Sequence, residues 1–373
     1  MKFSINKNII LQELINVSRA ISTRNIIPIL NGIKFELNNE GLYLTGSDSD
    51  LTIKSYIPKD KIDNVEKEGV IIIQSKYLLD IIKKMPGEII NFEVVDDLKI
   101  IIYSDNSEYN LNCLNSLDYP EIQLEDNTKH INLEAKELKK MISQTLFAVS
   151  VQESRPLLTG LNVKVNGDIL ECVATDSYRL AKKVINLSTP YDEAVNIVIP
   201  GRTIGELDKI LDDKEDNVEI HIFSKKIMFK YNNIIFQTNL LNGEYPNTSN
   251  FIPTEFTHVI TANLNDFYSS LDRAALLTQS KEKNIVKMEL NEDMLILSSF
   301  ASEIGKVEDK IKVNRNIKDA TNISFSSKYM MDALKTFDSE DILINMTTDS
   351  KPIILKVPND DSLIQLILPI KTY

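Results

Sequence analysis

The chain has 373 residues, of which 43% are hydrophobic and 26% are charged, a balance typical of a globular protein with two or three domains. No apolar run approaches the roughly 20 residues that a membrane-spanning helix needs. The first residues lack the apolar core of a secretion signal, so we expect a cytoplasmic protein. The net charge of -12 excludes binding to nucleic acid through bulk positive charge, so any such role must depend on where the cations are placed.

The chain begins with a predicted short strand at residues 3–5, which leads into an amphipathic helix. Apolar residues recur there at a spacing that places them on one helical face. These residues are Ile10, Leu14, Val17 and Ile21. Two alternating strands at 32–37 and 41–46 follow, and the Asn-Asn-Glu-Gly segment between them predicts a tight turn.

A second step from strand to helix follows at residues 70–86. The strand at 70–73 leads into a helix for which we predict Ser75 as the N-cap and Pro86-Gly87 as the stop. Further strands are predicted at 89–95, 98–103 and 108–114. We therefore expect two halves, each with a strand, a helix and further strands, and with the helices packed on one face of antiparallel sheets.

The rest of the chain repeats this pattern. Three residues of the first copy return 128 positions later: Pro28 as Pro156, Gly32 as Gly160 and Asp48 as Asp176. The alternating strand at 34–38 returns in a third copy at 287–291. We therefore predict an α+β fold made of three tandem copies of one domain, at residues 1–127, 128–254 and 255–373.

The second helix of every copy carries cations at the same two positions. The pairs are Lys76 and Lys83, Arg202 and Lys209, and Lys328 and Lys335. Seven residues make about two helical turns, so both cations project from one face. On a single helix this is ordinarily a solvated face, stabilised by the acid between the cations. Three such helices in an arc would meet phosphates at regular steps, which predicts sequence-independent binding of double-stranded DNA.

The sequence offers little for catalysis. It has no phosphate-binding glycine loop, no nucleophile elbow and no spaced set of metal ligands, so we predict no enzyme activity, no cofactor and no metal. The three histidines occupy unrelated places in the repeat, and we expect His130 and His258 to be surface imidazoles. A magnesium-dependent nuclease using scattered carboxylates and a monomeric protein-interaction scaffold remain as alternatives.

Two further residue types have ordinary explanations. Asp48 and Asp176 stand at equivalent strand ends, where an aspartate more often forms a turn with its own backbone than acts as a catalytic acid. Cys113 and Cys172 are far apart and outside any CxxC spacing, which predicts two reduced thiols.

Several segments carry a family resemblance across essentially the whole chain. They are Met1–Ile5, Arg24 with Pro28–Leu30, Leu44–Asp48, Val173–Ala181, Asn242–Pro246 and Leu366–Ile370. With these segments the chain resembles the bacterial DNA polymerase III beta subunit, the sliding clamp. The resemblance implies a head-to-tail homodimer that closes into a ring around DNA and tethers the replicative polymerase.

The resemblance also implies roles for particular residues. Leu276 and Leu277 match the apolar side of the dimer interface, and Tyr109 and Leu111 match its partner strand. The two loop positions that touch DNA in the family are matched by Arg24 and Gln152.

A pocket for short hydrophobic motifs is implied as well. By position it comprises Leu158, Thr175, Tyr178, Arg179, Leu180, Pro246, Leu366, Leu368, Pro369 and Ile370. Its partners would be the DNA polymerase III catalytic subunit, the clamp loader, and other polymerases and repair proteins. Without the resemblance, Leu158, Leu180 and Leu366 are better explained as ordinary core residues.

The chain departs from the family pattern at three places. Asn250 stands where a pocket arginine is common, Ser177 replaces a usual glycine, and the ending Lys371-Thr372-Tyr373 replaces Arg-Leu. We expect these departures to change the polar rim of the pocket and its motif preference.

Overall fold

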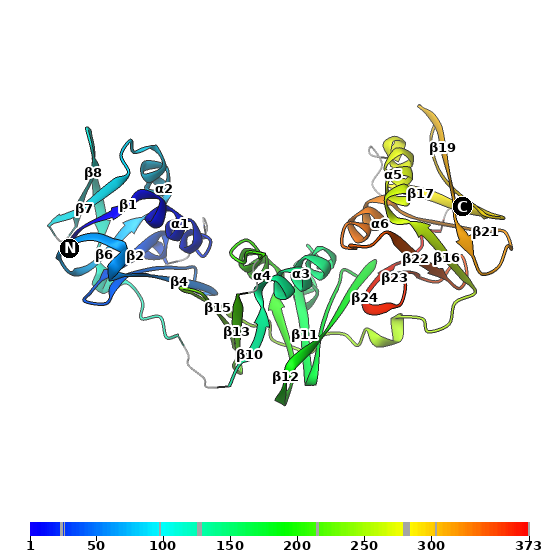
Figure 1. The fold of residues 1–373 in the computed structure, drawn as a ribbon, viewed down its shortest axis with the longest axis horizontal. Coiled ribbons are helices and arrows are strands. Elements are labelled where there is room, and N and C mark those ends of the chain that lie inside the picture. The colour runs from blue at the N-terminus through cyan, green and yellow to red at the C-terminus, as the bar shows by residue number, and fades with distance from the viewer. Residues whose placement is uncertain are drawn as a thin grey trace. The chain divides into compact units, whose positions relative to one another are not determined.

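The computed structural model describes residues 1–22, 25, 27–96, 98–124, 129–213, 216–278, 284–302 and 304–371 (Figure 1). The chain divides into two compact units, Met1–Glu137 with Glu206–Leu240 and Leu138–Gly205 with Leu241–Tyr373. No helix in the described ranges is both long enough and apolar enough to cross a membrane.

One antiparallel sheet runs through the first unit, and its order within the described ranges is β10-β13-β14-β15-β4-β3-β2-β6-β9-β8-β7-β1-β5. Its strands from the first repeat are β1 (Lys2–Asn6), β2 (Gly32–Leu37), β3 (Gly41–Ser47), β4 (Leu51–Pro58), β5 (Ile62–Lys67), β6 (Gly69–Gln74), β7 (Ile89–Asp96), β8 (Lys99–Ser104) and β9 (Ser107–Leu114). Those from the second repeat are β10 (Ile131–Glu134), β13 (Asn217–Ile222), β14 (Lys226–Tyr231) and β15 (Ile234–Asn239). Because β15 pairs with β4, with Phe236 opposite Ile53, the sheet continues from one repeat into the next.

The helices α1 (Lys7–Ser18) and α2 (Ser75–Lys84) pack against each other in this unit (Figure 1). Ile10, Leu14 and Val17 of α1 are fully buried, as their spacing predicts. The prediction for Ile21 is wrong, because α1 ends at Ser18 and Ile21 is half-buried beyond it. The predicted turn after β2 is confirmed, because the Asn38 side chain accepts hydrogen bonds from the backbone N–H groups of Glu40 and Gly41.

The prediction that Ser75 caps α2 is wrong. Gln74 occupies the cap position without a side-chain cap, and Ser75 is the first helical residue. The Ser75 hydroxyl instead donates to the backbone oxygen of Asn31 at 2.9 Å. The hydroxyl therefore ties the start of α2 to the chain just before β2.

The second unit contains two antiparallel sheets in the described part of the chain, with orders β11-β12-β24-β23-β22-β16-β20 and β19-β18-β17-β21. Strands β11 (Gly160–Thr175) and β12 (Arg179–Pro200) belong to the second repeat. The third repeat supplies β16 (His258–Asn263), β17 (Ile285–Asn291), β18 (Met294–Ala301), β19 (Gly305–Lys312), β20 (Asn314–Arg315), β21 (Thr321–Ser326), β22 (Asp341–Met346), β23 (Ile353–Val357) and β24 (Asp360–Ile367).

The remaining helices complete the repeat. α5 (Leu264–Ala275) packs against α6 (Ser327–Leu334) in the second unit, while α3 (Ala135–Thr145) and α4 (Gly201–Asp208) run across the division between the units. The helices α2, α4 and α6 each begin at the residue that follows a strand, namely β6, β12 and β21. The second strand-to-helix step is therefore present three times, as predicted.

The two cysteines behave as predicted. Cys113 and Cys172 are both buried and unpaired with each other. Burial raises the pKa of Cys113 to about 12 and also raises the pKa of Cys172, so both stay as thiols at neutral pH.

Candidate functional site

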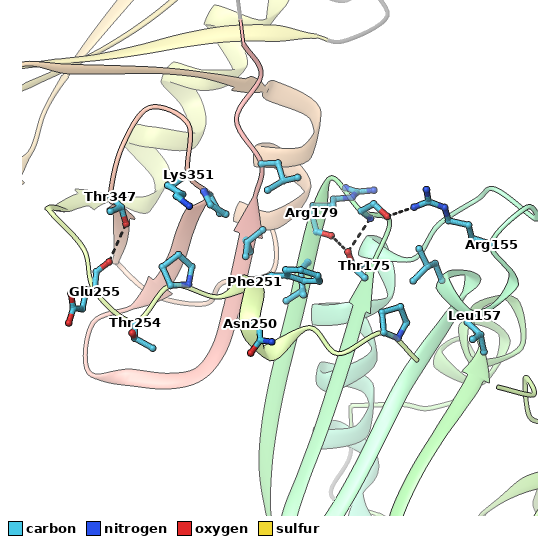
Figure 2. A pocket seen from close by; sticks show the side chains of 18 of the residues that line it. Arg155, Leu157, Thr175, Arg179, Asn250, Phe251, Thr254, Glu255, Thr347 and Lys351 are labelled. Carbon is cyan, nitrogen blue, oxygen red and sulfur yellow. Dashed lines mark hydrogen bonds between the residues drawn. The ribbon is translucent and has the colours of Figure 1, made fainter. Parts of the chain in front are cut away.

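A cavity of about 1000 Å³ lies in the second unit, a size suited to a small ligand or a short peptide (Figure 2). Its lining comes from residues 155–158, from β11, β12 and β24 and the residues next to them, from the segment 246–255, and from the loop between β22 and β23. The residues that line it are Arg155, Pro156, Leu157, Leu158, Thr175, Ser177, Arg179, Leu180, Pro246, Asn250, Phe251, Pro253, Thr254, Glu255, Thr347, Lys351, Pro352, Leu366 and Leu368.

The apolar floor of the cavity follows from strand register. Leu180 on β12 lies directly opposite Leu366 on β24, so both side chains point to the same face of the sheet. Leu158 joins them in one buried cluster that also contains Val173 and Ile354. These leucines are therefore both core residues and lining residues, which unites the two explanations that the sequence left open.

The turn between β11 and β12 is fixed by its own side chains. The Asp176 carboxylate accepts hydrogen bonds from the backbone N–H groups of Tyr178 and Arg179, at 2.9 and 3.1 Å. The Thr175 hydroxyl donates to the backbone oxygen of Arg179 at 2.6 Å. The prediction that Asp176 is a turn former is confirmed, and so is the one for Asp48, which accepts from the N–H groups of Asp50 and Leu51.

Arg179 is the charged group at the centre of this wall. Its guanidinium donates to Asp176 at 3.0 Å and to Asp332 of α6 at 2.8 Å. The guanidinium carbon also lies 4.5 Å from the ring centre of Tyr329 and 5.2 Å from that of Phe147. Only 11% of the Arg179 side chain is exposed, so these contacts hold the cation nearly dry beside the apolar floor.

The backbone conformation of Ser177 explains why glycine is common at this position in the family. Its φ of 77° lies in the left-handed region, where a Cβ atom is unfavourable. The serine hydroxyl accepts a hydrogen bond from the Arg155 guanidinium at 2.9 Å (Figure 2). The departure from glycine therefore adds a polar link across the rim of the cavity.

A buried tyrosine holds the end of β11 in place at the cavity. The Tyr245 hydroxyl accepts a hydrogen bond from the backbone N–H of Thr175 at 3.1 Å. Burial raises the pKa of Tyr245 to about 12, so this hydroxyl stays neutral over the physiological range. The segment that carries Tyr245 runs on to Pro246, Asn250 and Phe251, which places all three at the cavity.

Polar side chains form the rim of the cavity. In Figure 2, Arg155 lies on one side, beside the apolar Leu157, and Thr347, Lys351 and Glu255 lie on the other. The Thr347 hydroxyl donates to the backbone oxygen of Glu255 at 3.1 Å, which joins two loops of that side. An apolar floor with a polar rim suits a peptide whose large apolar side chains enter and whose backbone stays near the rim.

Comparison with known proteins agrees with this geometry. Models of the DNA polymerase III beta subunit match the N-terminal domain at residues 1–123, the central domain at 132–247 and the C-terminal domain at 249–371. The beta sliding clamps of Bacillus subtilis (strain 168) and Staphylococcus aureus (strain Mu50 / ATCC 700699) are 40% and 38% identical, with 100% of each chain covered. The crystal structure of the Bacillus subtilis DNA polymerase sliding clamp matches with a TM-score of 0.96 at 40% identity, over 100% of both chains. This chain belongs to the DNA polymerase III beta subunit family.

Membership of this family confirms the predicted fold class of three tandem clamp domains. A beta sliding clamp is a processivity factor for DNA replication and does not itself catalyse a reaction, so the chain functions as a DNA sliding clamp. DNA and a DNA polymerase are the partners that such a function requires. The domain boundaries at 127 and 254 stay a prediction.

Most of the predicted pocket residues of the clamp meet in the cavity. Seven of the ten line it: Leu158, Thr175, Arg179, Leu180, Pro246, Leu366 and Leu368. Tyr178, Pro369 and Ile370 are not among the lining residues. Tyr178 is 58% exposed, and its ring stacks near that of Tyr329, with 6.4 Å between ring centres. The Ile370 N–H donates to the backbone oxygen of Ser324.

Most residues on the far rim, the side of the cavity opposite Arg155, were not predicted from the sequence. Phe251, Pro253, Thr254 and Glu255 come from an irregular segment, and Thr347, Lys351 and Pro352 come from a turn between strands. Neither stretch has a periodic pattern that would indicate burial. The cluster of prolines around an exposed aromatic residue at 246–253 was the available signal, because such a segment is rigid enough to form a wall.

The paired cations predicted to contact DNA lie on α2, α4 and α6, except Lys209 and Lys335, which directly follow α4 and α6. Lys76, Lys83, Arg202, Lys209, Lys328 and Lys335 are all exposed. The acidic residues between the cations form different ion pairs. Glu206 pairs with Lys209 at 2.7 Å, whereas Asp332 pairs with Arg179. Gln152 is exposed, and Arg24 lies outside the described residues.

The four predicted interface residues are all at least partly exposed: Tyr109 and Leu276 are exposed, and Leu111 and Leu277 are half-buried. Tyr109 and Leu111 lie on the part of β9 that pairs with β8, whereas β6 pairs only with the far end of β9, at Cys113 and Leu114. One edge of β9 at 107–112 therefore has no strand partner among the described residues. Leu276, in the turn after α5, is 61% exposed.

Proposed function

We propose that two copies of this chain close head to tail into a ring that encircles duplex DNA without reading its sequence. The observation that carries this proposal is the full-length match, at 40% identity, to a DNA polymerase sliding clamp. The unpaired edge of β9 offers backbone N–H and C=O groups to a second chain, and the exposed Leu276 offers apolar area for the same contact. The ring acts in the cytoplasm, where the chromosome lies.

The helices α2, α4 and α6 supply the DNA-facing surface in this proposal. Their exposed lysines and arginines meet phosphates and no bases, which gives the same affinity for every sequence. The net charge of -12 disfavours binding of the outer surface to DNA. Retention on DNA then depends on ring opening, and weak phosphate contacts allow sliding.

Charge reversal tests this surface. Replacing Lys76, Lys83, Arg202 and Lys209 by Glu should reduce loading onto DNA by about tenfold or more, because the new carboxylates repel the phosphates that the cations neutralise. The matched control replaces four exposed lysines outside these helices, Lys59, Lys61, Lys67 and Lys225, with the same change in net charge. Loading that falls equally in both variants contradicts a role specific to the helices.

Sedimentation tests the ring. The proposal requires a particle of twice the chain mass of 42.4 kDa, both in the native chain and in the two charge variants. Replacing Leu276 by Asp should shift the population towards single chains, because a charge at this position would disfavour an apolar partner surface. A single-chain mass for the native protein at all concentrations would favour a monomeric interaction scaffold instead.

The cavity in the second unit is the proposed site for partner proteins. The polymerase III catalytic subunit, the clamp loader, and other polymerases and repair proteins would each insert a short apolar motif over Leu180 and Leu366. Binding to a ring that stays on DNA raises the effective concentration of the polymerase at the primer end, which is the origin of processivity. Because these partners share one cavity, they compete for it.

A further inference from the structure

Two histidines and a glutamate converge in the first unit, on strands β10 and β13. Ile131 lies opposite Ile220 and Asn132 lies opposite Glu219, so the same antiparallel register brings His130 opposite His221. Because side chains alternate along a strand, Glu219 lies on the same face as His221, two residues before it. Sheet register thus places three potential metal ligands side by side.

The distances fit ligands of one ion. His221 Nε2 lies 3.1 Å from Glu219 Oε2, and the ring centres of His130 and His221 are 5.1 Å apart. One donor atom from each of the three residues lies within 4.8 Å of the others. Zinc binds imidazole nitrogen and carboxylate oxygen at about 2.0–2.2 Å, which separates two ligands of a tetrahedral ion by roughly 3.3 Å. A small side-chain rotation therefore brings all three onto one ion.

Burial also favours a metal site. The His221 side chain is only 2% exposed and is hydrogen-bonded to Glu219, while His130 and Glu219 are partly exposed. A buried ring thus anchors the set, and the two outer ligands leave access for an ion and a fourth, water ligand. The chain's third histidine, His258, is buried, so the prediction of a surface imidazole is wrong there. Burial and the nearby Arg315 lower its pKa, and no carboxylate set surrounds it in the described residues.

We propose that His130, Glu219 and His221 bind one zinc ion. The donor set of two imidazoles and one carboxylate selects a transition metal over magnesium or calcium, which prefer all-oxygen sites. The ion joins the residue that precedes β10 to β13, and so fixes the first strand of the second repeat at the end of the sheet. The convergence of these three donor atoms contradicts the expectation that the chain has no set of potential metal ligands. The proposed zinc site does not depend on the proposed ring.

The ion must compete with contacts that exist without it. Glu219 bonds His221 and lies opposite Lys230 of β14, and the two imidazole rings contact each other. Zinc exchanges these contacts for stronger bonds to imidazole nitrogen and carboxylate oxygen. Zinc that binds the folded chain and not the unfolded one raises the melting temperature.

Direct titration with zinc tests the site. The untagged full chain is stripped with a chelator and titrated with Zn²⁺ by calorimetry at neutral pH. We expect one ion per chain in the native protein, and at least about tenfold weaker binding in both His130→Gln and Glu219→Gln. The matched control is Asn132→Ala, which changes an exposed residue opposite Glu219 and should bind as the native chain does.

Cobalt provides a second readout. Co²⁺ in a site with nitrogen ligands absorbs visible light with an intensity that depends on its geometry, so bound Co²⁺ should give a spectrum that Zn²⁺ abolishes by displacement. Both glutamine variants change outer residues, so circular dichroism should show them folded. Absence of binding, equal binding in all variants, or loss in only one of the two glutamine variants would overturn the three-ligand site.

Discussion

The turn at 48–51 and the turn at 176–179 occupy equivalent positions in the first and second repeats, and they are built alike. In each, an aspartate accepts two backbone N–H groups, and the next residue is a serine in the left-handed region, with φ of 81° at Ser49 and 77° at Ser177. Each turn also has a cavity in its unit, of about 950 Å³ beside Pro28 and about 1000 Å³ beside Pro156. The backbone of the turn is therefore common to both repeats, but only the turn of the second repeat lines its cavity.

The two turns differ at their fourth residue. The first repeat has Leu51, which is buried, where the second has Arg179. Arg179 reaches Asp332 of the third repeat and joins the turn to α6. The two repeats therefore share the backbone of this turn, and Arg179 adds to the second copy a contact with another repeat that the first copy lacks.

Replacing Arg179 by Leu, the residue of the first repeat, should have the largest effect. The change leaves the carboxylates of Asp176 and Asp332 without their cation in a nearly dry site, so we expect a loss of about 2–3 kcal/mol in the free energy of unfolding. Arg179→Lys keeps the charge but cannot bond Asp176 and Asp332 with the same geometry, so its loss of free energy of unfolding should be intermediate. Urea denaturation measures both, and a loss below about 0.5 kcal/mol for the leucine variant would contradict the central role of Arg179.

The two turn aspartates should differ when each is replaced by Ala. Asp48→Ala removes the backbone hydrogen bonds of its turn and should cost about 1 kcal/mol. Asp176→Ala removes the same bonds and also the ion pair to Arg179, so about 2 kcal/mol is expected. The difference between the two costs, measured by urea denaturation, isolates the ion pair, and equal costs would show that the extra contact is energetically neutral.

The equivalent residues Ile29 and Leu157 test whether both cavities bind partners. Each lines the cavity of its own unit and neither is fully buried. Leu157→Ala should weaken binding of the polymerase III catalytic subunit by about tenfold, as expected for removing an apolar contact at the edge of a binding site. Ile29→Ala should leave it unchanged, and surface plasmon resonance can compare the two. Equal losses would mean that the first cavity binds the partner as well.

The smallest effect is expected at the two left-handed serines. Ser49→Gly relieves an unfavourable backbone conformation and should raise the free energy of unfolding by about 0.5 kcal/mol. Ser177→Gly should gain less, because it also loses the hydrogen bond from Arg155. Thermal unfolding measures both, and a larger gain at Ser177 would show that the Arg155 contact does not stabilise the turn.

Local patterns predicted much of the fold. The spacing of Ile10, Leu14 and Val17 predicted the buried face of α1, and the repeat predicted where α2, α4 and α6 begin. Within the site, Asp176 was predictable as a turn former because its bonds reach only residues two and three positions away. These features depend on neighbours in the sequence.

Features that depend on distant pairing were not predictable. The pairing of β15 with β4 and the bond from Arg179 to Asp332 join residues more than a hundred positions apart. His130 and His221 meet only because β10 and β13 share a register, and the sequence alone fixes no register between strands so far apart. The loops that form the far rim of the cavity carry no periodicity, and the prolines around Phe251 were the one signal that their sequence offered.

The most direct measurement concerns topology. The chain is loaded onto nicked circular DNA by a clamp loader, free protein is removed, and the circle is then cut once with a restriction enzyme. The account predicts that the protein stays on the circle, leaves the linear DNA, and is retained again when bulky blocks close both ends. Equal loss from the uncut circle, or retention on linear DNA with open ends, would contradict a ring that encircles DNA.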